Sequence, residues 1–402
     1  MSALDQIFVT IKHWILNLGF LPEVIKPLLS ILLSISPLIG FFAFLFAITT
    51  VLERKGLGRI QNRLGPNRVG IFKWRLCGFG QFIADGLKML TKEDIVPTTA
   101  DRVVHFLAPV VLIVPVILAL SVVPFGRNMT PLALDSGVLF FFAVGAATEL
   151  SVFMAGWSSN NKYSLLGAMR AIAQMISYEL PLVLSSITVI MMCGSLNLDD
   201  IVSTQAPVVL GFVHDWNVFK PWGLAGFILF LIAAAAESNR TPFDLPEAES
   251  ELVAGYFTEY SGFKFALFFL GEYFGLFAVS GLGITLFLGG WQAPFTFLDF
   301  IPSWLWFVIK LLGFVFFFIW LRGTLPRLRT DQLMNFAWKF VLPMSLANIV
   351  VAGIWRYSAD WHLPGGMAAR WLICGLLILI PYVLLGRSFE NRITRRVYRY
   401  AG

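Results

Sequence analysis

The chain has 402 residues, of which 57% are hydrophobic and only 13% are charged, with 30 Lys and Arg against 24 Asp and Glu. Its mean hydropathy of +0.77 lies far above that of soluble globular domains and excludes that class. The uncharged runs are roughly the 20 residues that a membrane-crossing helix needs and show no strand-like alternation, which predicts an all-α polytopic membrane protein and argues against a β-barrel.

Nine membrane spans are predicted from the apolar runs. They lie at residues 31–52, 103–124, 136–157, 171–193, 221–238, 263–289, 303–322, 336–356 and 370–386. Most basic residues fall in the loops after the odd-numbered spans and in the C-terminal tail. Because cytoplasmic loops carry the excess of Lys and Arg, we expect the N-terminus outside and the C-terminus in the cytoplasm.

The first 30 residues form an expected segment of their own. Asp5 and Lys12 interrupt the region, which argues against a signal peptide. An apolar helix face is formed by Ile7, Ile11, Trp14, Ile15 and Leu18. This pattern predicts an amphipathic helix that lies in the membrane interface.

A basic loop, residues 53–102, follows the first span and carries seven Lys and Arg between Arg54 and Arg75. Two interpretations stay open, namely anchoring to acidic lipid headgroups and docking of a peripheral partner protein. No dinucleotide fingerprint or phosphate loop is present, and no nucleic acid partner is expected. Farther along this loop, an amphipathic helix is predicted, with Leu87 and Leu90 on its apolar face and Asp85 opposite.

Three carboxylates fall within predicted spans: Glu149, Glu179 and Glu272. A carboxylate at the centre of a bilayer costs about 2.5–3.5 kcal/mol, so each should face protein or water. One such acid is equally well explained by a buried interhelical hydrogen bond. Three of them, together with the acids of the next loop, favour a path for protons.

Residues 236–264 connect two long apolar runs and hold a quarter of all the acids of the chain. These are Glu237, Asp244, Glu247, Glu249, Glu251 and Glu259. Pro242 and Pro246 should break the helix, and Glu247 and Glu251 lie one turn apart if a helix restarts after Pro246. Composition alone leaves two interpretations, a wet acidic loop or a proton site. The basic loop 322–335 is expected to pair with this connector.

Only three cysteines and four histidines are present, all far apart in the sequence. No Cys-x-x-Cys and no pair of His at helical spacing occurs, so neither an iron–sulfur cluster nor a haem or metal site is expected. Any electrons would have to come from another subunit.

Five runs resemble the H subunit (subunit 1) family of proton-pumping NADH:quinone oxidoreductases, the respiratory complex I enzymes. They are ERKGLGRIQNRLGPNRVG (53–70), ADGLKMLTKEDIVP (84–97), RAIAQMISYELPL (170–182), AESNRTPFDLPEAESELVAGYFTEYSG (236–262) and RGTLPRLRTDQLMNFAWKFVLP (322–343). They occur in the order found in the family. Residues 31–356 then correspond to an eight-span domain, with cytoplasmic loops 53–102, 237–262 and 322–335. Residues 357–402 add a ninth span and a basic tail beyond the usual end, and no role can be assigned to them.

The resemblance implies a membrane subunit that forms the quinone-access chamber and couples quinone reduction to proton translocation. It assigns residues to the chamber (Arg54, Arg59, Arg63, Asp85, Glu247, Glu249 and Glu251) and to the proton path (Glu149, Glu179, Glu237, Asp244 and Glu272). It also implies quinone as substrate, with NADH, flavin and iron–sulfur clusters on partner subunits of the peripheral arm. Antiporter-like membrane subunits and membrane lipid would be further neighbours, in a bacterial cytoplasmic membrane in preference to the mitochondrial inner membrane.

Two alternatives stay open at this point. The first is the related membrane subunit of a hydrogenase or of another dehydrogenase, because nothing in this chain selects the electron donor. The second is a proton-coupled secondary transporter that acts alone. The absence of a visible internal repeat argues against the transporter.

Overall fold

The structure is a computed structural model that describes residues 7–17, 26–70, 76–209, 211–244, 254–358 and 366–390. Within these ranges the chain is helical apart from one short hairpin, in which β1 (Val208–Val209) pairs antiparallel with β2 (Val213–His214). The all-α class predicted from the sequence is confirmed.

The bundle is formed by long helices, which are accompanied by shorter helices and helical turns. The long ones are α2 (Lys26–Ile60), α4 (Arg102–Val122), α5 (Gly137–Gly145) followed by α6 (Ala147–Ser158), α7 (Lys162–Cys193), α9 (Pro221–Glu237), α11 (Gly262–Phe287), α12 (Ser303–Thr324), α14 (Leu342–Tyr357) and α15 (Gly366–Glu390). The short ones are α1 (Ile7–Leu16), α3 (Gln81–Thr91), α8 (Leu198–Ser203), α13 (Thr330–Phe336), the 3₁₀ turns η2 (Leu76–Gly78), η3 (Asn217–Phe219), η4 (Gly255–Phe257) and η5 (Thr296–Leu298), and the π turn η6 (Ala337–Val341).

The predicted spans correspond to these long helices. Among the described residues, eight helical segments are long and apolar enough to cross a membrane, with α5 and α6 forming one segment and α13 to α14 another. The predicted fifth span corresponds to α9, which is apolar but has only 17 residues. The chain is therefore a multi-pass membrane protein. The orientation of its termini stays a prediction.

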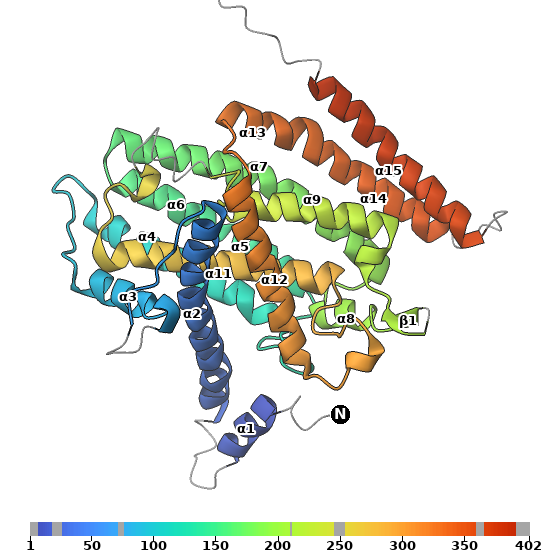
Figure 1. Cartoon of the computed structure of the whole chain (residues 1–402), viewed down its shortest axis with the longest axis horizontal. Helices are drawn as coiled ribbons and strands as arrows, with labels where there is room; N and C mark the ends of the chain where they lie inside the picture. The colour runs from blue at the N-terminus through green and yellow to red at the C-terminus, as the bar shows by residue number, and fades with distance from the viewer. Residues whose placement is uncertain are drawn as a thin grey trace, which may run out of the picture.

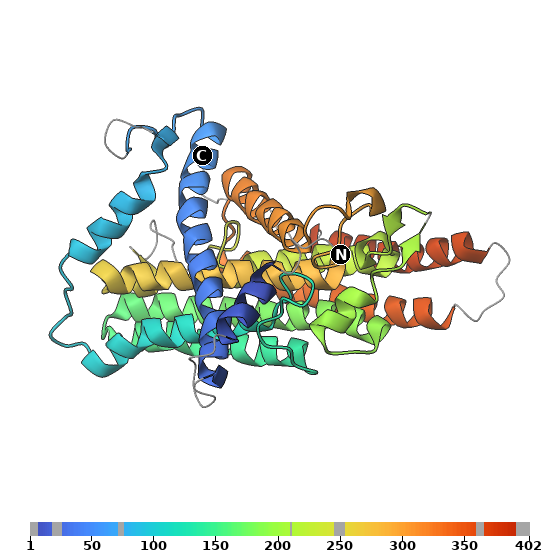
Figure 2. The ribbon, with the colours of Figure 1, turned by 90° about the horizontal axis from the view of Figure 1, so that it is seen from below.

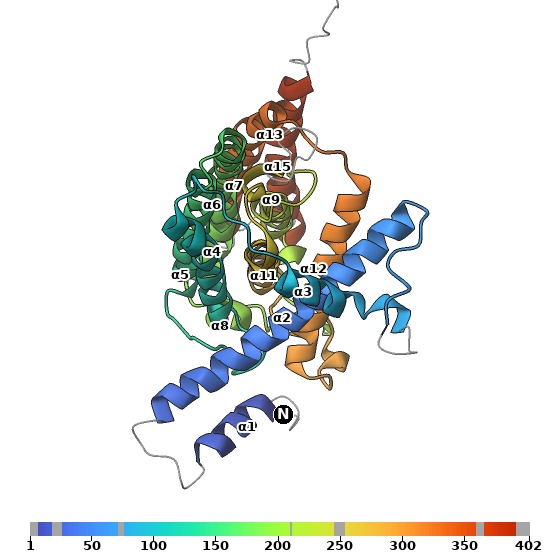
Figure 3. The ribbon, with the colours of Figure 1, turned by 90° about the vertical axis from the view of Figure 1, so that its left-hand side faces the viewer.

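Most of the long helices run side by side as an elongated bundle, and α2 and α12 cross it obliquely (Figure 1). The view along the bundle places α2 and α12 together on one side, next to α11 (Figure 3). Helix α7 packs against α6, α9 and α14, and α4 packs against α6 and α11. The short helix α1 lies along the first part of α2, to which the Lys12 ammonium is joined by a hydrogen bond to Ser34 Oγ of 2.7 Å.

Helix α3 lies at one end of the bundle, whereas α8 and β1 lie at the other (Figures 1 and 2). The interfacial helix predicted near the N-terminus corresponds to α1, whose Phe8, Ile11 and Trp14 are exposed. The amphipathic helix predicted in the basic loop corresponds to α3. Its apolar side chains Leu87 and Leu90 are exposed, as expected of a helix that lies on a membrane surface.

Two helices extend beyond the spans predicted from hydropathy. Helix α2 continues to Ile60 rather than ending near residue 52, and α7 begins at Lys162 rather than near residue 171. Charged residues end an apolar run, but they do not end a helix when their side chains reach water. The side chain of Asn161 accepts the backbone N–H of Tyr163 and so caps the first turn of α7.

Lys310, a buried lysine within α12, is held by backbone carbonyl groups. Its Nζ donates to the carbonyl oxygens of Leu288 (2.6 Å), Gly290 (2.8 Å) and Gln292 (2.7 Å). The ammonium also lies over the ring of Trp216, 4.2 Å from the ring centroid. The amino group of Lys310 satisfies carbonyl groups just after the C-terminus of α11 that no helix N–H reaches.

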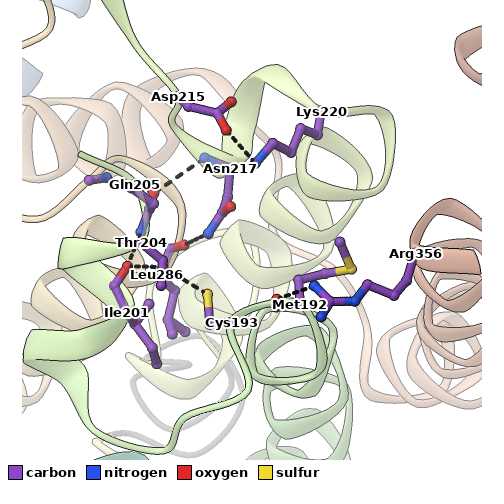
Figure 4. Close-up of polar contacts among 11 residues, drawn as sticks. Met192, Cys193, Ile201, Thr204, Gln205, Asp215, Asn217, Lys220, Leu286 and Arg356 are labelled. Carbon is purple, nitrogen blue, oxygen red and sulfur yellow. Dashed lines mark hydrogen bonds and ion pairs between the residues drawn. The ribbon is translucent and has the colours of Figure 1, made fainter. Parts of the chain in front are cut away.

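Gln205 connects four segments at the end of the bundle that carries β1, and Figure 4 shows its contacts with Ile201 and Asn217. Its amide nitrogen donates to the carbonyl oxygens of Ile201 (3.1 Å) and Thr285 (2.9 Å). Its amide oxygen accepts the backbone N–H groups of Asn217 (3.2 Å) and Gly289 (3.1 Å). The side chain is only 1% exposed, so these bonds replace water for every polar atom of the amide.

We predict that Gln205→Leu lowers the stability of this end of the bundle. The apolar side chain leaves two buried N–H groups without an acceptor, which should reduce the free energy of unfolding by about 2–5 kcal/mol. The midpoint of thermal unfolding of the purified protein should fall. In the control Gln61→Leu, an exposed glutamine is replaced, and the midpoint should stay within error of the parent. Equal midpoints for both variants would contradict the prediction.

Candidate functional site

A cavity of about 80 Å³ lies inside the bundle, between α4, α5, α7, α11 and the end of α9. Most of its wall is apolar, with Val116, Phe141 and Leu182 among the side chains. The polar part of the wall is formed by three carboxyl groups and by Tyr256, Thr148, Ser238 and Asn239. The volume is sufficient for several water molecules.

The three carboxyl groups of the wall belong to Glu179 of α7, Glu237 of α9 and Glu272 of α11. Glu149 of α6 lies beside them, within electrostatic range of Glu179 and Glu237. The structure thus brings together four of the five acids that the resemblance assigned to the proton path. Among the described residues, no Lys or Arg lines this cavity.

Two of these acids have a buried oxygen that no hydrogen-bond donor of the described chain reaches, namely Glu149 Oε1 and Glu237 Oε2. A buried oxygen without a donor is unfavourable unless water or a proton satisfies it. Glu237 lines a cavity with space for water, and Glu149 lies beside Glu179 of the same wall. The arrangement is suited to carboxyl groups that exchange protons with water and with one another.

Gln174 of α7 fixes the chain on both sides of Glu237. Its amide nitrogen donates to the carbonyl oxygens of Ala236 (2.8 Å) and Phe243 (2.6 Å), and Gln174 is completely buried. The end of α9 and the first residues of the connector are therefore held against α7. Glu237 is kept at the cavity by this contact.

Asp244, the fifth acid assigned to the path, lies elsewhere. It is 3% exposed, and its Oδ2 pairs with the guanidinium of Arg327 at 2.8 Å. The backbone N–H of Leu328 also donates to the carbonyl oxygen of Pro242 at 3.1 Å. These contacts confirm that the basic loop after α12 pairs with the connector, and they place Asp244 in an ion pair rather than at the cavity.

A second cluster forms around Glu53, near the end of α2 that lies beside α12. Glu53 is 5% exposed and forms ion pairs with Arg322 and with Arg240, the latter at 3.3 Å. The hydroxyl of Tyr273 donates to Glu53 Oε2 at 2.5 Å. The Arg240 guanidinium also lies over the Tyr273 ring, 4.2 Å from its centroid. One carboxylate thereby joins α2, the connector, α11 and α12.

The neighbouring groups keep the guanidinium of Arg240 charged. Burial acts to lower the pKa of the guanidinium, but the facing Tyr273 and Glu53 outweigh it and hold that pKa above its usual range. Arg240 therefore stays charged and neutralises Glu53 in a place with little water.

The residues assigned to the quinone chamber are only partly brought together. Arg54 on α2 pairs with Asp85 on α3 at 2.5 Å, and this pair joins the two helices. Arg59 and Arg63 are exposed beyond that pair. Glu247, Glu249 and Glu251 lie in 245–253, outside the described residues, and the helix expected to restart after Pro246 lies there too.

The later part of the connector is attached to α4, α6 and α7. The Tyr260 ring stacks on the buried His105 of α4, with 4.0 Å between the ring centroids, and its hydroxyl lies 3.3 Å from Ser158 Oγ. Burial raises the pKa of Tyr260 to about 12, so its hydroxyl keeps its proton. The Asn161 amide donates to Glu259 Oε1 at 2.7 Å.

Comparisons with known proteins identify the family. A family profile described as NADH dehydrogenase matches residues 33–353. The chain belongs to the NADH dehydrogenase family. The H subunit of NADH-quinone oxidoreductase from Bacillus cytotoxicus is 50% identical over 316 residues, which are 78% of this chain and 90% of the relative. The corresponding protein from Carboxydothermus hydrogenoformans is 46% identical over 351 residues, covering 86% and 95%, and that from Dehalococcoides mccartyi is 51% identical over 315 residues, covering 78% and 83%.

These comparisons confirm the resemblance to the H subunit that the sequence runs indicated. The chain is a membrane subunit of an NADH:quinone oxidoreductase, and it works as part of a complex. In this member of the NADH dehydrogenase family, α15 lies outside the matched range.

Sequence reasoning missed Glu53 as a site residue. It stands at the start of a conspicuously basic run, so the arginines drew attention and the single acid did not. One sequence signal was present: Thr49 and Glu53 are four residues apart and so share a helix face. The structure buries both side chains. The two arginines that neutralise Glu53 are 187 and 269 residues away in the chain. No local sequence pattern indicates that such distant residues will pair.

We predict that Glu53→Gln strongly destabilises the complex. The substitution leaves Arg240 and Arg322 without the carboxylate they share, and breaking a buried ion pair in this way costs about 3–5 kcal/mol. The yield of assembled complex and its half-life on heating should both fall. The control Asp85→Asn breaks the exposed pair with Arg54, for which we expect less than about 1 kcal/mol. Similar heat stability of the two variants would show that Glu53 is not the structural centre of its cluster.

Proposed function

We propose that Glu149, Glu179, Glu237 and Glu272 form the proton-transfer element of this membrane subunit. The observation that carries the proposal is the cavity itself, where carboxyl groups from α7, α9 and α11 face a common space with room for water and no cation in its described wall. Such an arrangement has no evident value for stability, because repulsion between like charges is strong where water is scarce. It has an evident use if the groups exchange protons.

Repulsion also explains how the element would work. The acids cannot all be ionised at once at low free energy, so the group holds a proton that several oxygens share. A change of charge nearby then redistributes protons among them. Water in the cavity supplies the short hydrogen-bonded links that transfer between carboxyl groups requires.

We further propose that the face formed by α2 and α3 belongs to the quinone-access chamber. Support comes from the exposed apolar side chains of α3, which suit a lipid-soluble ligand, and from the neighbouring pair of Arg54 with Asp85. Arg59 and Arg63 would add positive charge on this side. For Glu247, Glu249 and Glu251 a place in the chamber stays a prediction from the sequence.

In the proposed sequence of events, quinone enters from the bilayer and is reduced by an iron–sulfur cluster of a peripheral-arm subunit. The altered charge acts on the connector and then on Glu179, Glu149 and Glu272. NADH and flavin would be bound by the peripheral arm, and antiporter-like membrane subunits would continue the proton path. Because the relatives are bacterial, we place the chain in a bacterial cytoplasmic membrane.

We predict that Glu237→Gln uncouples the complex at this cavity. The amide has similar shape but cannot bind or release a proton at working pH, so proton translocation should fall by at least about tenfold. The measurement is the pH change driven by NADH and a short-chain quinone in proteoliposomes. NADH oxidation by a water-soluble electron acceptor should not change, because that reaction needs only the peripheral arm.

Glu259→Gln is the matched control. Glu259 belongs to the same connector but contacts Asn161 and does not line the cavity. It should translocate protons like the parent. Parent-like translocation by Glu237→Gln would remove this acid from the path, and an equal loss in both variants would show that acids of the connector act only on folding.

A further inference from the structure

Tyr256 connects the connector with the acid of α11. It belongs to the turn η4, it is 1% exposed, and both Tyr256 and Glu272 line the cavity. Its hydroxyl donates to Glu272 Oε1 at 3.0 Å. A phenol at this distance is a neutral donor that keeps its own proton and favours the charged form of the carboxyl group that it contacts.

The position of this hydroxyl is set by the way the connector lies on α7. Gly167 of α7 approaches Gly255 so closely that a Cβ on Gly167 would come within 2.8 Å of Gly255 Cα. Gly255 itself has φ of +55°, a conformation that favours glycine. The Ser164 hydroxyl donates to the carbonyl oxygen of Tyr256 at 3.3 Å. Backbone contacts, rather than the tyrosine side chain alone, therefore hold the turn.

The ring of Tyr256 is enclosed by aromatic neighbours. It packs against Phe257, with 3.9 Å between the ring centroids, and edge-on against Phe268 at 5.9 Å. Both neighbours belong to the apolar cluster around the start of α11. The ring can therefore move only with η4, and any displacement of η4 on α7 changes the distance from the hydroxyl to Glu272.

We propose that Tyr256 is a positioning residue for proton transfer, whose hydroxyl directs the carboxyl group of Glu272 and makes its affinity for a proton depend on how the connector lies on α7. The inference rests on the proposed function of the cavity. It adds a named route by which the connector acts on an acid in the membrane. When η4 lies against α7 as in this structure, the hydroxyl stabilises the ionised carboxyl group, and when η4 moves away, the carboxyl group retains a proton.

The test compares Tyr256→Phe with Tyr260→Phe in the intact complex. Both remove one buried hydroxyl from the same connector and keep an aromatic ring, but Tyr260 faces Ser158 rather than an acid. Tyr256→Phe should lower the rate of proton translocation about tenfold, which corresponds to the loss of one hydrogen bond to a charged group. Tyr260→Phe should pump like the parent.

An infrared difference spectrum between the oxidised and NADH-reduced complex provides a readout that a structural role would not move. The carboxylate-stretch signal of ionised Glu272, the form that the Tyr256 hydroxyl contacts, is the one that Glu272→Gln removes. Tyr256→Phe should shift this signal, because a donor to the carboxylate is lost, and Tyr260→Phe should leave it in place. If Tyr256→Phe assembles poorly, 3-fluorotyrosine at position 256 keeps the ring and provides a stronger donor, and the signal should shift in the opposite direction.

The outcomes separate this inference from the function on which it rests. Parent-like pumping by Glu272→Gln would overturn the proposed function of the cavity. Impaired pumping by Glu272→Gln together with parent-like pumping and an unmoved signal in Tyr256→Phe would overturn only the role of Tyr256. An unmoved signal with 3-fluorotyrosine would overturn it as well.

Discussion

A carboxylate that leaves bulk water needs either a counter-charge or a proton, and this constraint divides the buried acids of the chain into two kinds. Glu53 and Asp244 have arginine partners, with Arg240 and Arg322 on the first and Arg327 on the second. Among the described residues no Lys or Arg is paired with Glu149 or Glu237, and each of these two acids has a buried oxygen without a donor, as Asp244 has on the oxygen that Arg327 does not reach. The paired acids join loops and helices, because an ion pair with two arginines from distant segments fixes those segments. The acids at the cavity fix nothing comparable, which supports the proposal that they exchange protons.

Helix α11 connects the two kinds of acid. Glu272 lines the cavity, whereas Tyr273, the next residue, donates to Glu53 in the arginine cluster. Successive residues of a helix point about 100° apart, so a single turn of α11 faces both sites. Arg240 is also within electrostatic range of Glu272. A change of charge at the Glu53 cluster therefore has a direct electrostatic effect on an acid of the cavity, without any need for a large movement. The connector acts on the same acid from the other side through Tyr256.

Much of the fold was predictable, because a helix that crosses a membrane must be apolar along its length. Hydropathy and the spacing of apolar residues show this requirement directly. The start of α12 at Ser303 and that of α9 at Pro221 agree with the predicted spans. The end of α2 and the start of α7 did not agree, because beyond the apolar run hydropathy gives no signal and hydrogen bonds and capping decide the length of the helix. Glu149, Glu179 and Glu272 were recognisable because a charge within an apolar run is conspicuous. Glu53 was not, since it stands at the edge of such a run and among basic residues.

What the sequence does not contain is the pairing of residues that are distant along the chain. The burial of Glu53 depends on its ion pairs with Arg240 and Arg322. Gln174 holds the connector at Ala236 and Phe243, which are 62 and 69 residues away in the chain. Tyr256 and Glu272 are only 16 residues apart, yet helical spacing does not relate them, because the chain turns at Gly262 between η4 and α11 with φ of +57°. The turn brings the phenol of one segment to the carboxyl group of the next. The acidic connector thus reaches Glu272 through one neutral hydroxyl, whereas its own Asp244 and Glu259 are held by Arg327 and Asn161. Charge composition identified the connector as unusual, but the group that reaches the membrane acid carries no charge and therefore left no signal in that composition.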